Sequence, residues 1–219
     1  MVCLAAWQGA HLLITSEPDC GQDRLARIVH SISRFRSRTI VELDQVPVDR
    51  ANQLELIRRH AARSTLVLDL GDDDTRLPSS FITTVFSARF QIRVIALARS
   101  LAVADEALGE RARQMQHLRV PSIVDRPEAV DRLLDRMFVE RGSPLRVAGL
   151  TLDNQRALRG HGWPGNFASL RQAADRLAAI TRLGSINKAA HELGVAPATL
   201  YHWYSKTMRL SHPLVSASP

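Results

Sequence analysis

Residues 185–206 constrain the fold of this chain more than any other stretch. Apolar side chains in their first half follow the spacing i, i+3, i+4 and i+7, which predicts a helix with one buried face. These side chains belong to Ile186, Ala189, Ala190 and Leu193. Ser185 stands at the N-cap position, and Gly194 follows the last apolar residue, where a helix stop needs a positive φ. A first helix is therefore expected to end in a tight turn.

A second helix is expected after that turn. Pro197 suits its first position, because the missing N–H would have no partner there. Leu200 and Tyr204 give this helix an inner face. The small Ala190, the turn Gly194 and the large Leu200 stand at the offsets of a helix-turn-helix. The segment therefore predicts a helix-turn-helix whose second helix lies in the major groove of DNA. The alternative is an ordinary αα-hairpin packed into a helical domain.

The outer face of the second helix supplies the predicted DNA contacts. Ala198 can touch a thymine methyl group, Thr199 a phosphate or base edge, and His202 a guanine or a phosphate. Trp203 is expected against the sugar backbone, with packing against Trp163 or a partner subunit as the alternative. The predicted DNA-binding residues are Lys188, Ala198, Thr199, Tyr201, His202, Trp203 and Lys206. Because this face carries little charge, a homodimer or larger oligomer is expected to raise the affinity.

The charge balance of the chain favours a polyanionic partner. The sequence holds 29 basic and 22 acidic residues, a formal net charge of +7. Residues 167–219 hold six basic and two acidic residues, or +4, whereas the other 166 residues carry +3. The excess is concentrated around the predicted helix-turn-helix, as a phosphate partner requires. The alternative is a general preference for arginine, since 27 of the 29 basic residues are Arg.

Several classes of protein are excluded by what the sequence lacks. Cys3 and Cys20 are too few for a disulfide framework or a zinc site. The apolar runs are too short to span a membrane, and the first residues lack the pattern of a signal peptide. Residues 72–74 are all Asp and are interpreted as a solvated loop rather than a metal site. We expect a cytoplasmic protein with no metal and no membrane partner.

Strands and helices alternate along the first hundred residues. Strands are predicted at residues 11–15, 39–43, 64–70 and 92–96, and helices at 23–35, 51–63 and 79–86. This alternation predicts a three-layer α/β fold around a parallel sheet. After Arg99 no further strand is predicted. Helices are expected at residues 101–118, 126–141, 151–160 and 167–183. The turn at 161–166 is expected to bury Trp163, and the tail after Leu210 to be loose.

The first strand, the loop after it and the next helix have the arrangement of a phosphate-binding loop. In that motif two glycines are followed by a lysine and a hydroxyl residue. Ser16 takes the first glycine position here, and Gly21 takes the second. Gln22 replaces the lysine, and Asp23 brings a carboxylate to the helix N-terminus, where it competes with phosphate. The sequence therefore predicts a vestigial loop and no bound cofactor.

The order of these segments resembles the sigma-54-dependent transcription activators of the NtrC type, which are AAA+ ATPases with a C-terminal Fis-type helix-turn-helix. Residues 12–30 resemble the family's first strand, phosphate loop and helix, and residues 64–74 its second nucleotide motif. Residues 92–101 resemble the sensor I strand. Residues 162–176 resemble the lid turn and the sensor II helix, and residues 188–203 the reading head.

The resemblance implies an α/β, parallel-sheet AAA+-like core, an all-α lid and a C-terminal helix-turn-helix. The expected parts are a degenerate AAA+-like domain at 1–120, a lid-like subdomain at 121–183, the helix-turn-helix at 184–210 and a loose tail at 211–219. The family's loop that touches sigma-54 has no counterpart in this sequence. Remodelling of a sigma-54 polymerase is therefore not expected.

Three departures from the family affect the expected chemistry. Gln22 replaces the loop lysine, Leu70 the acid that activates water, and Ala168 the sensor II arginine. Phosphoryl transfer depends almost entirely on positioning and charge stabilisation, which these residues supply. Asp69 matches a magnesium-binding acid but is interpreted as a structural residue at a strand end. The sequence therefore predicts that the chain is not an enzyme and has no catalytic residue.

The favoured function is a sequence-specific DNA-binding transcription regulator on a catalytically dead AAA+ scaffold. It is expected to bind double-stranded DNA as a dimer or larger oligomer, without ATP hydrolysis. One alternative is an interaction protein that forms hetero-oligomers with an intact AAA+ activator and modulates it. Another is an atypical ATPase. An AAA+ activator and RNA polymerase are the further candidate partners.

Overall fold

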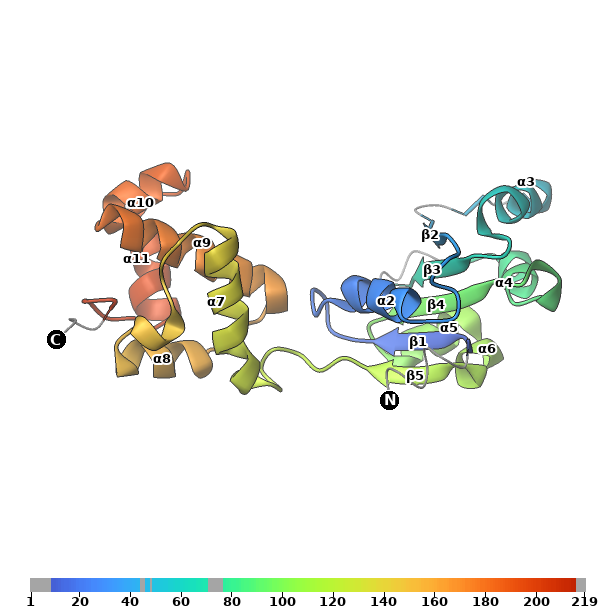
Figure 1. The fold of residues 1–219 in the computed structure, drawn as a ribbon, viewed down its shortest axis with the longest axis horizontal. Coiled ribbons are helices and arrows are strands. Elements are labelled where there is room, and N and C mark those ends of the chain that lie inside the picture. Colours follow the sequence, from blue (N-terminus) through green and yellow to red (C-terminus); the bar gives the residue numbers. More distant parts are fainter. Residues whose placement is uncertain (1–8, 44–45, 48, 71–76, 216–219) are drawn as a thin grey trace. The chain divides into compact units, whose positions relative to one another are not determined.

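The computed structural model describes residues 9–43, 46–47, 49–70 and 77–215. The chain divides into two compact units, residues 1–120 and residues 121–219 (Figure 1). The first unit contains strands and helices, and the second contains helices joined by turns. The acidic run at residues 72–74 and Cys3 lie outside the described residues, and Cys20 is a buried free cysteine.

A five-stranded parallel sheet forms the centre of residues 1–120 (Figure 1). Its strands are β1 (Leu12–Thr15), β2 (Ile40–Glu42), β3 (Thr65–Asp69), β4 (Arg93–Ala98) and β5 (Gln116–Arg119). They lie in the order β2-β3-β4-β1-β5. Strands β1 and β4 are buried along their whole length, because a parallel sheet is covered on both faces. The predicted three-layer α/β architecture is confirmed.

Helices cover both faces of this sheet. They are α2 (Gln22–Ser31), α3 (Arg50–Leu56), the π-helical turn η1 (Ile57–Ala61), α4 (Ser79–Val85), the 3-10 turn η2 (Ala88–Phe90), α5 (Leu101–Leu108) and α6 (Glu110–Gln114). Successive strand residues point to opposite faces. Leu12 and Ile14 therefore pack in one cluster with Val29 of α2. Leu13 packs in the other cluster with Phe81 of α4.

Strand β5 is a correction to the sequence prediction, which expects residues 116–118 to be helical. Gly109 has φ 58° and separates α5 from α6, so the expected long helix is interrupted. Residues Gln116 to Arg119 then pair in parallel with β1. Their side chains alternate between half-buried and exposed, as is typical of an edge strand. Polar residues at three of these four positions leave no apolar run to indicate a strand.

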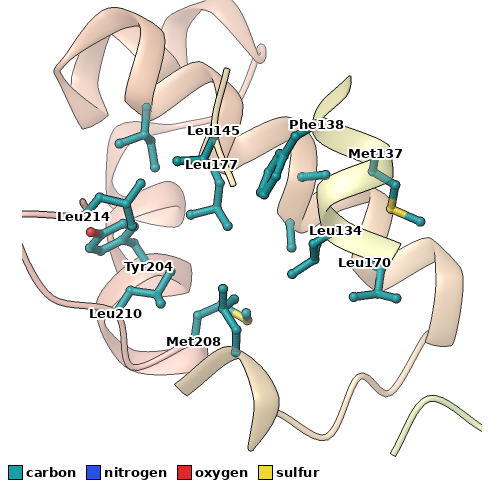
Figure 2. Close-up of a cluster of buried hydrophobic side chains, with 14 of the residues drawn as sticks. Leu134, Met137, Phe138, Leu145, Leu170, Leu177, Tyr204, Met208, Leu210 and Leu214 are labelled. Carbon is teal, nitrogen blue, oxygen red and sulfur yellow. The ribbon is translucent and has the colours of Figure 1, made fainter. Parts of the chain in front are cut away.

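Residues 121–219 are helical. Their elements are η3 (Pro127–Ala129), α7 (Val130–Glu140), η4 (Val147–Gly149), α8 (Leu152–Arg159), α9 (Asn166–Leu183), α10 (Ile186–Glu192), α11 (Pro197–His202) and the π-helical turn η5 (Trp203–Thr207). One apolar cluster joins them (Figure 2). Leu134 and Phe138 of α7 and Leu177 of α9 belong to the same core as Tyr204 and Met208. The residues expected to form a lid and those expected to form a reading head therefore share one hydrophobic core.

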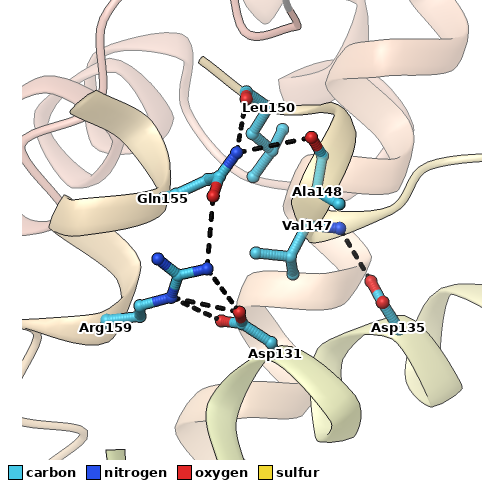
Figure 3. A network of polar contacts seen from close by, with 7 residues as sticks. All are labelled: Asp131, Asp135, Val147, Ala148, Leu150, Gln155 and Arg159. Atoms are coloured by element: carbon cyan, nitrogen blue, oxygen red, sulfur yellow. Dashed lines mark hydrogen bonds and ion pairs between the residues drawn. The ribbon is translucent and has the colours of Figure 1, made fainter. Parts of the chain in front are cut away.

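Polar contacts fix the connection between α7 and α8 (Figure 3). Arg159 donates hydrogen bonds to both carboxylate oxygens of Asp131. Gln155 Nε2 donates to the carbonyl oxygen of Leu150 at 2.9 Å, and the backbone N–H of Val147 donates to Asp135 Oδ1 at 2.7 Å. The contacts of Gln155 and Asp135 satisfy backbone groups in and beside the η4 turn, and the Arg159–Asp131 pair joins α8 to α7.

The tail after Leu210 is packed rather than loose as far as residue 215. Asn154 Nδ2 donates to the carbonyl oxygen of Ser211 at 2.9 Å and contacts two further tail carbonyls. Leu214 is 6% exposed, and Tyr204 Oη donates to the Ser211 carbonyl oxygen at 3.0 Å. Burial raises the pKa of Tyr204 to about 12. The expectation of a loose tail is therefore wrong for residues 211–215; residues 216–219 lie outside the described part.

None of the helices in the described ranges combines the length and the apolar character that a membrane crossing requires.

Candidate functional site

Two short helices and a tight turn present one exposed face in residues 185–207. Ser185 caps α10, Gly194 has φ 66° in the turn, and Pro197 is the first residue of α11, each as predicted. The inner side is closed, because Ala190 and Leu200 are both fully buried. The outer side exposes six of the seven predicted contact residues: Lys188, Ala198, Thr199, Tyr201, His202 and Lys206.

The seventh predicted contact, Trp203, is a correction. Its side chain is 8% exposed and lies in the core of residues 121–219. The guanidinium of Arg176 on α9 covers its ring at 4.7 Å from the centroid. Trp203 follows Leu200 by three residues, so the helical repeat places both on the same, inner side. The prediction of a DNA contact by Trp203 is therefore wrong for the described structure.

Local contacts hold the exposed face in place. The backbone N–H of Val195 donates to the carbonyl oxygen of Ala190 at 3.0 Å and closes the turn. Arg182, near the end of α9, forms an ion pair with Glu192 at the end of α10. Tyr201 is 59% exposed, a large aromatic side chain directed to solvent beside Thr199. The exposed face thus combines small, polar and aromatic side chains.

A second candidate site is a pocket of about 230 Å³ in residues 1–120. It lies at the carboxyl ends of β1, β3 and β4, where open parallel sheets bind ligands. It is lined by Ser16, Pro18, Asp19, Gln22, Asp69, Leu97, Ala98 and Arg99. Gly21, with φ 86°, makes the turn from this loop into α2. The fold thus brings the loop interpreted as a vestigial phosphate loop next to Asp69, although about fifty residues separate them in the sequence.

The chemistry of this pocket can be read from its side chains. Ser16 Oγ and Gln22 Oε1 are buried and have no hydrogen-bond partner among the described residues. The N-terminus of α2, ten residues long, favours an anion at this edge. Arg99 brings a positive charge, and the carboxylates of Asp19 and Asp69 are ligands suited to a divalent cation. A phosphate group with a bound Mg²⁺ is therefore compatible with the pocket.

Leu70 contributes nothing to this pocket. It is 2% exposed and packs in the apolar cluster under the sheet, while its backbone N–H donates to the Leu97 carbonyl oxygen at 2.8 Å. The position therefore supplies no acid to activate water. Sequence reasoning did not include Asp19 among the site residues, because nothing in the spacing of one loop shows which side chains of other loops it will meet. In the described part of the chain, no group of three or more His, Cys, Asp or Glu side chains is arranged to hold a metal ion by itself.

Comparison with known proteins gives a fold but no close relative. No protein-family model matches the sequence, and no curated protein matches it. NtrX from Brucella abortus, solved with ATP, superposes with a TM-score of 0.60 and 17% identity over 92% of this chain. The match covers 64% of the NtrX chain, so this chain spans less than two thirds of that protein. A RuvB mutant from Thermotoga maritima gives 0.62 and 12%, with 98% of this chain and 89% of RuvB covered.

A katanin structure described by its self-assembly gives a TM-score of 0.54 and 22% identity, over 81% of this chain and 59% of katanin. Together these structures support an AAA+ fold for the chain. They contradict the prediction that the chain is not an enzyme, because the matched structures are AAA+ ATPases and NtrX is solved with both ATP and ADP. That prediction gave weight to Gln22, Leu70 and Ala168 and took no account of the pocket that remains. Identities this low establish the fold and not the reaction.

Proposed function

We propose that the chain is a DNA-binding transcription regulator in which a helix-turn-helix, residues 184–210, is joined to an AAA+-fold unit with a nucleotide site. The observation that supports this most directly is the exposed face of α10 and α11 above a closed apolar inner side. Of the six exposed contact residues on that face, all except Ala198 have a side chain that can donate or accept a hydrogen bond.

The proposed recognition chemistry assigns a role to each exposed residue. Thr199 and His202 contact base edges, Ala198 contacts a thymine methyl group, and Lys188 and Lys206 contact phosphates. Tyr201 donates its hydroxyl to a phosphate, which its 59% exposure allows. A head with two lysines binds weakly alone, so we propose that two or more copies act together on neighbouring half-sites. The self-assembly described for katanin is in keeping with an oligomer.

The second candidate function is an atypical ATPase, and the pocket at the carboxyl edge of the sheet favours it. Ser16, Gln22 and the N-terminus of α2 would hold the phosphates of a nucleotide. Arg99 would balance their charge, and Asp69 would bind the magnesium ion that accompanies them. A bound nucleotide would supply a phosphoanhydride bond whose hydrolysis can be measured directly. The AAA+ fold makes this activity the one to assay alongside DNA binding.

The DNA contacts are tested by the double substitution Thr199→Ala and His202→Ala. Both side chains are exposed, so the fold should persist while two base contacts are lost. Specific sites are first selected from genomic fragments with the wild-type protein. We expect the variant to lose about 2 kcal/mol, roughly thirty-fold in affinity, at these sites and to bind random DNA unchanged.

The matched control is Thr83→Ala with His60→Ala, which removes the same side chains from exposed positions in α4 and η1. This control should bind the selected sites as the wild type does. Unchanged site occupancy by the Thr199→Ala, His202→Ala variant would refute the proposed reading face.

The nucleotide site is tested by Gln22→Lys. A lysine at the start of α2 adds a positive charge beside the phosphates, and a charge-assisted hydrogen bond of this kind stabilises a complex by about 1.5 kcal/mol. We expect ATP and ADP to bind roughly tenfold more tightly in isothermal titration with Mg²⁺ present. Gln172→Lys adds the same charge at an exposed position of α9 and should change nothing. Equal affinity of wild type and Gln22→Lys would exclude the phosphates from this loop.

A further inference from the structure

The amino-terminal edge of the sheet in residues 1–120 is rich in arginine. All five strands are parallel, so the segments that lead into them meet at one edge. Residues 32–39, 61–64 and 86–93 contain six arginines and no acidic residue. At the opposite edge, residues 16–23 contain three acids and no basic residue, and Arg99 follows β4 there. The segments that lead into β2, β3 and β4 are therefore purely basic, whereas the pocket edge carries both signs of charge.

Backbone hydrogen bonds hold the basic segments side by side. The N–H of Thr65 donates to the carbonyl oxygen of Thr39 at 2.9 Å. The N–H of Arg63 donates to the Phe90 carbonyl oxygen at 2.9 Å, and the N–H of Arg93 donates to that of Ser64 at 3.0 Å. The three segments thus form one continuous strip. We call this strip the arginine edge; its residues are Arg34, Arg36, Arg38, Arg63, Arg89 and Arg93.

One aromatic ring gathers half of these guanidinium groups. The guanidinium carbons of Arg34, Arg38 and Arg93 lie 5.0, 4.8 and 5.7 Å from the centroid of Phe35. Arg93 is 1% exposed, and burial together with the charge of Arg34 lowers its pKa. Nη1 of Arg38 is buried and has no hydrogen-bond partner among the described residues. Positive groups held this close repel one another, and a bound anion would relieve that repulsion.

The remaining arginines of the edge face solvent. Arg34, Arg36, Arg63 and Arg89 are exposed, and none of the four forms an ion pair with a residue that the structure describes. Other arginines of the same unit do form such pairs, namely Arg27 with Glu42, Arg59 with Glu55 and Arg113 with Asp105. The four exposed arginines of the edge therefore have no acidic partner in the described part of the chain, which leaves their guanidinium groups available to an anion.

We infer that the arginine edge is a second DNA-contacting surface, which binds the phosphates of a duplex without reading its bases. The inference rests on the proposed DNA-binding function. A duplex presents one negative charge per about 1.7 Å of its axis, so a continuous strip of cations can neutralise several phosphates at once. The planar guanidinium group donates two parallel hydrogen bonds to a phosphate, which an ammonium group cannot do. The edge thus adds affinity, while the exposed face of α10 and α11 adds specificity.

The test uses the full chain and the fourfold substitution of Arg34, Arg36, Arg63 and Arg89 by Gln. Arg38 and Arg93 are retained because they pack against Phe35. Binding to a random-sequence duplex of about 30 base pairs is measured by fluorescence anisotropy between about 50 and 200 mM salt. Each lost phosphate contact lowers the magnitude of the slope of log K against log salt by about 0.9, so the loss of four contacts should lower it by about 3.6. At the lowest salt the affinity should fall at least about tenfold.

The matched control replaces Arg24, Arg50, Arg132 and Arg136 by Gln. These four are also exposed, and none belongs to the arginine edge. The control removes the same total charge, and its slope should change by less than about 1. Equal changes in both variants would mean that net charge alone attracts the DNA, and the inference would be wrong. A fourfold variant that binds DNA normally but no longer binds poly-L-glutamate would instead assign the edge to an acidic protein.

The outcome is separable from that of the proposed function. Thr199→Ala with His202→Ala should remove site preference and leave the salt slope unchanged, whereas the fourfold variant should do the opposite. Loss of slope without any site preference in the wild type would refute the reading face and retain the arginine edge. A normal salt slope in the fourfold variant, together with lost site preference in the Thr199→Ala, His202→Ala variant, would refute the arginine edge and retain the reading face. A wild-type protein that binds no duplex at about 50 mM salt overturns both.

Discussion

Replacing Trp163 by alanine is expected to lower the free energy of unfolding of residues 121–219 by about 3–5 kcal/mol. Trp163 is 2% exposed and is among the largest buried side chains of the described structure. It lies in the same apolar cluster as α7, α9 and the segment after α11, so its removal leaves a cavity that several helices line. The loss should appear as a shift of the urea midpoint, with faster hydrogen exchange of the α9 amides in mass spectrometry.

The control for this prediction is Trp163→Phe. The indole Nε1 is buried and has no hydrogen-bond partner among the described residues, so phenylalanine removes an unsatisfied donor while it keeps most of the ring. We expect this variant to lose less than half as much stability as the alanine variant. If Trp163→Ala lowered the free energy of unfolding by less than about 1 kcal/mol, the packing of Trp163 in the centre of this core would be refuted.

Replacing Asn154 by alanine is expected to lower the free energy of unfolding by about 3 kcal/mol. The loss should arise from hydrogen bonds to the tail rather than from a cavity in the core. The side chain is fully buried. Its Oδ1 accepts the N–H of Ser211 at 2.8 Å, and its Nδ2 reaches the carbonyl oxygens of Ser211, Pro213 and Leu214 at 2.9, 3.4 and 3.2 Å. Truncation leaves these backbone groups without their partner, at about 1 kcal/mol for each well-formed bond.

Thermal unfolding and limited proteolysis of the Asn154→Ala variant check this prediction. Cleavage should appear first within residues 211–215, which the wild type protects. Asn187→Ala, at an exposed position of α10, is the matched control and should change stability by less than about 0.5 kcal/mol. A tail that stays protected in the Asn154→Ala variant would show that Leu214 and the Tyr204 hydrogen bond hold it without Asn154.

The fold was predictable wherever apolar side chains follow a continuous run or a helical spacing along a segment. The buried strands β1 and β4 have continuous apolar runs, and α7 has an apolar face that includes Val130, Leu134 and Phe138. Strand β5 has neither, because it lies at an edge where partners, not composition, define the strand. The tail gives no local signal either: it is held by Asn154, a residue more than fifty positions away.

The candidate site was predictable in part for the same reason. Helical spacing identifies the outer face of α11, since Leu200 and Tyr204 fix its inner side. Trp203 was misassigned because side-chain type suggested a contact while its spacing from Leu200 already indicated the core. The pocket depends on the order of the strands, which brings Asp19, Asp69 and Arg99 together from three loops. Motif residues judged one at a time could not show that arrangement.

The shared core of α7, α9 and α11 decides how this protein can be divided or recombined. A graft that moved only residues 184–210 into another protein would separate Ala190, Leu200 and Tyr204 from the residues they pack against. Both parts would then expose apolar surface that is buried in the intact chain. The boundary suited to such a division is between Val120 and Pro121, where one compact unit ends and the other begins. Transfer of the proposed reading face to another protein would therefore require exchange of residues 121–219 as one unit, with the helices that pack behind that face.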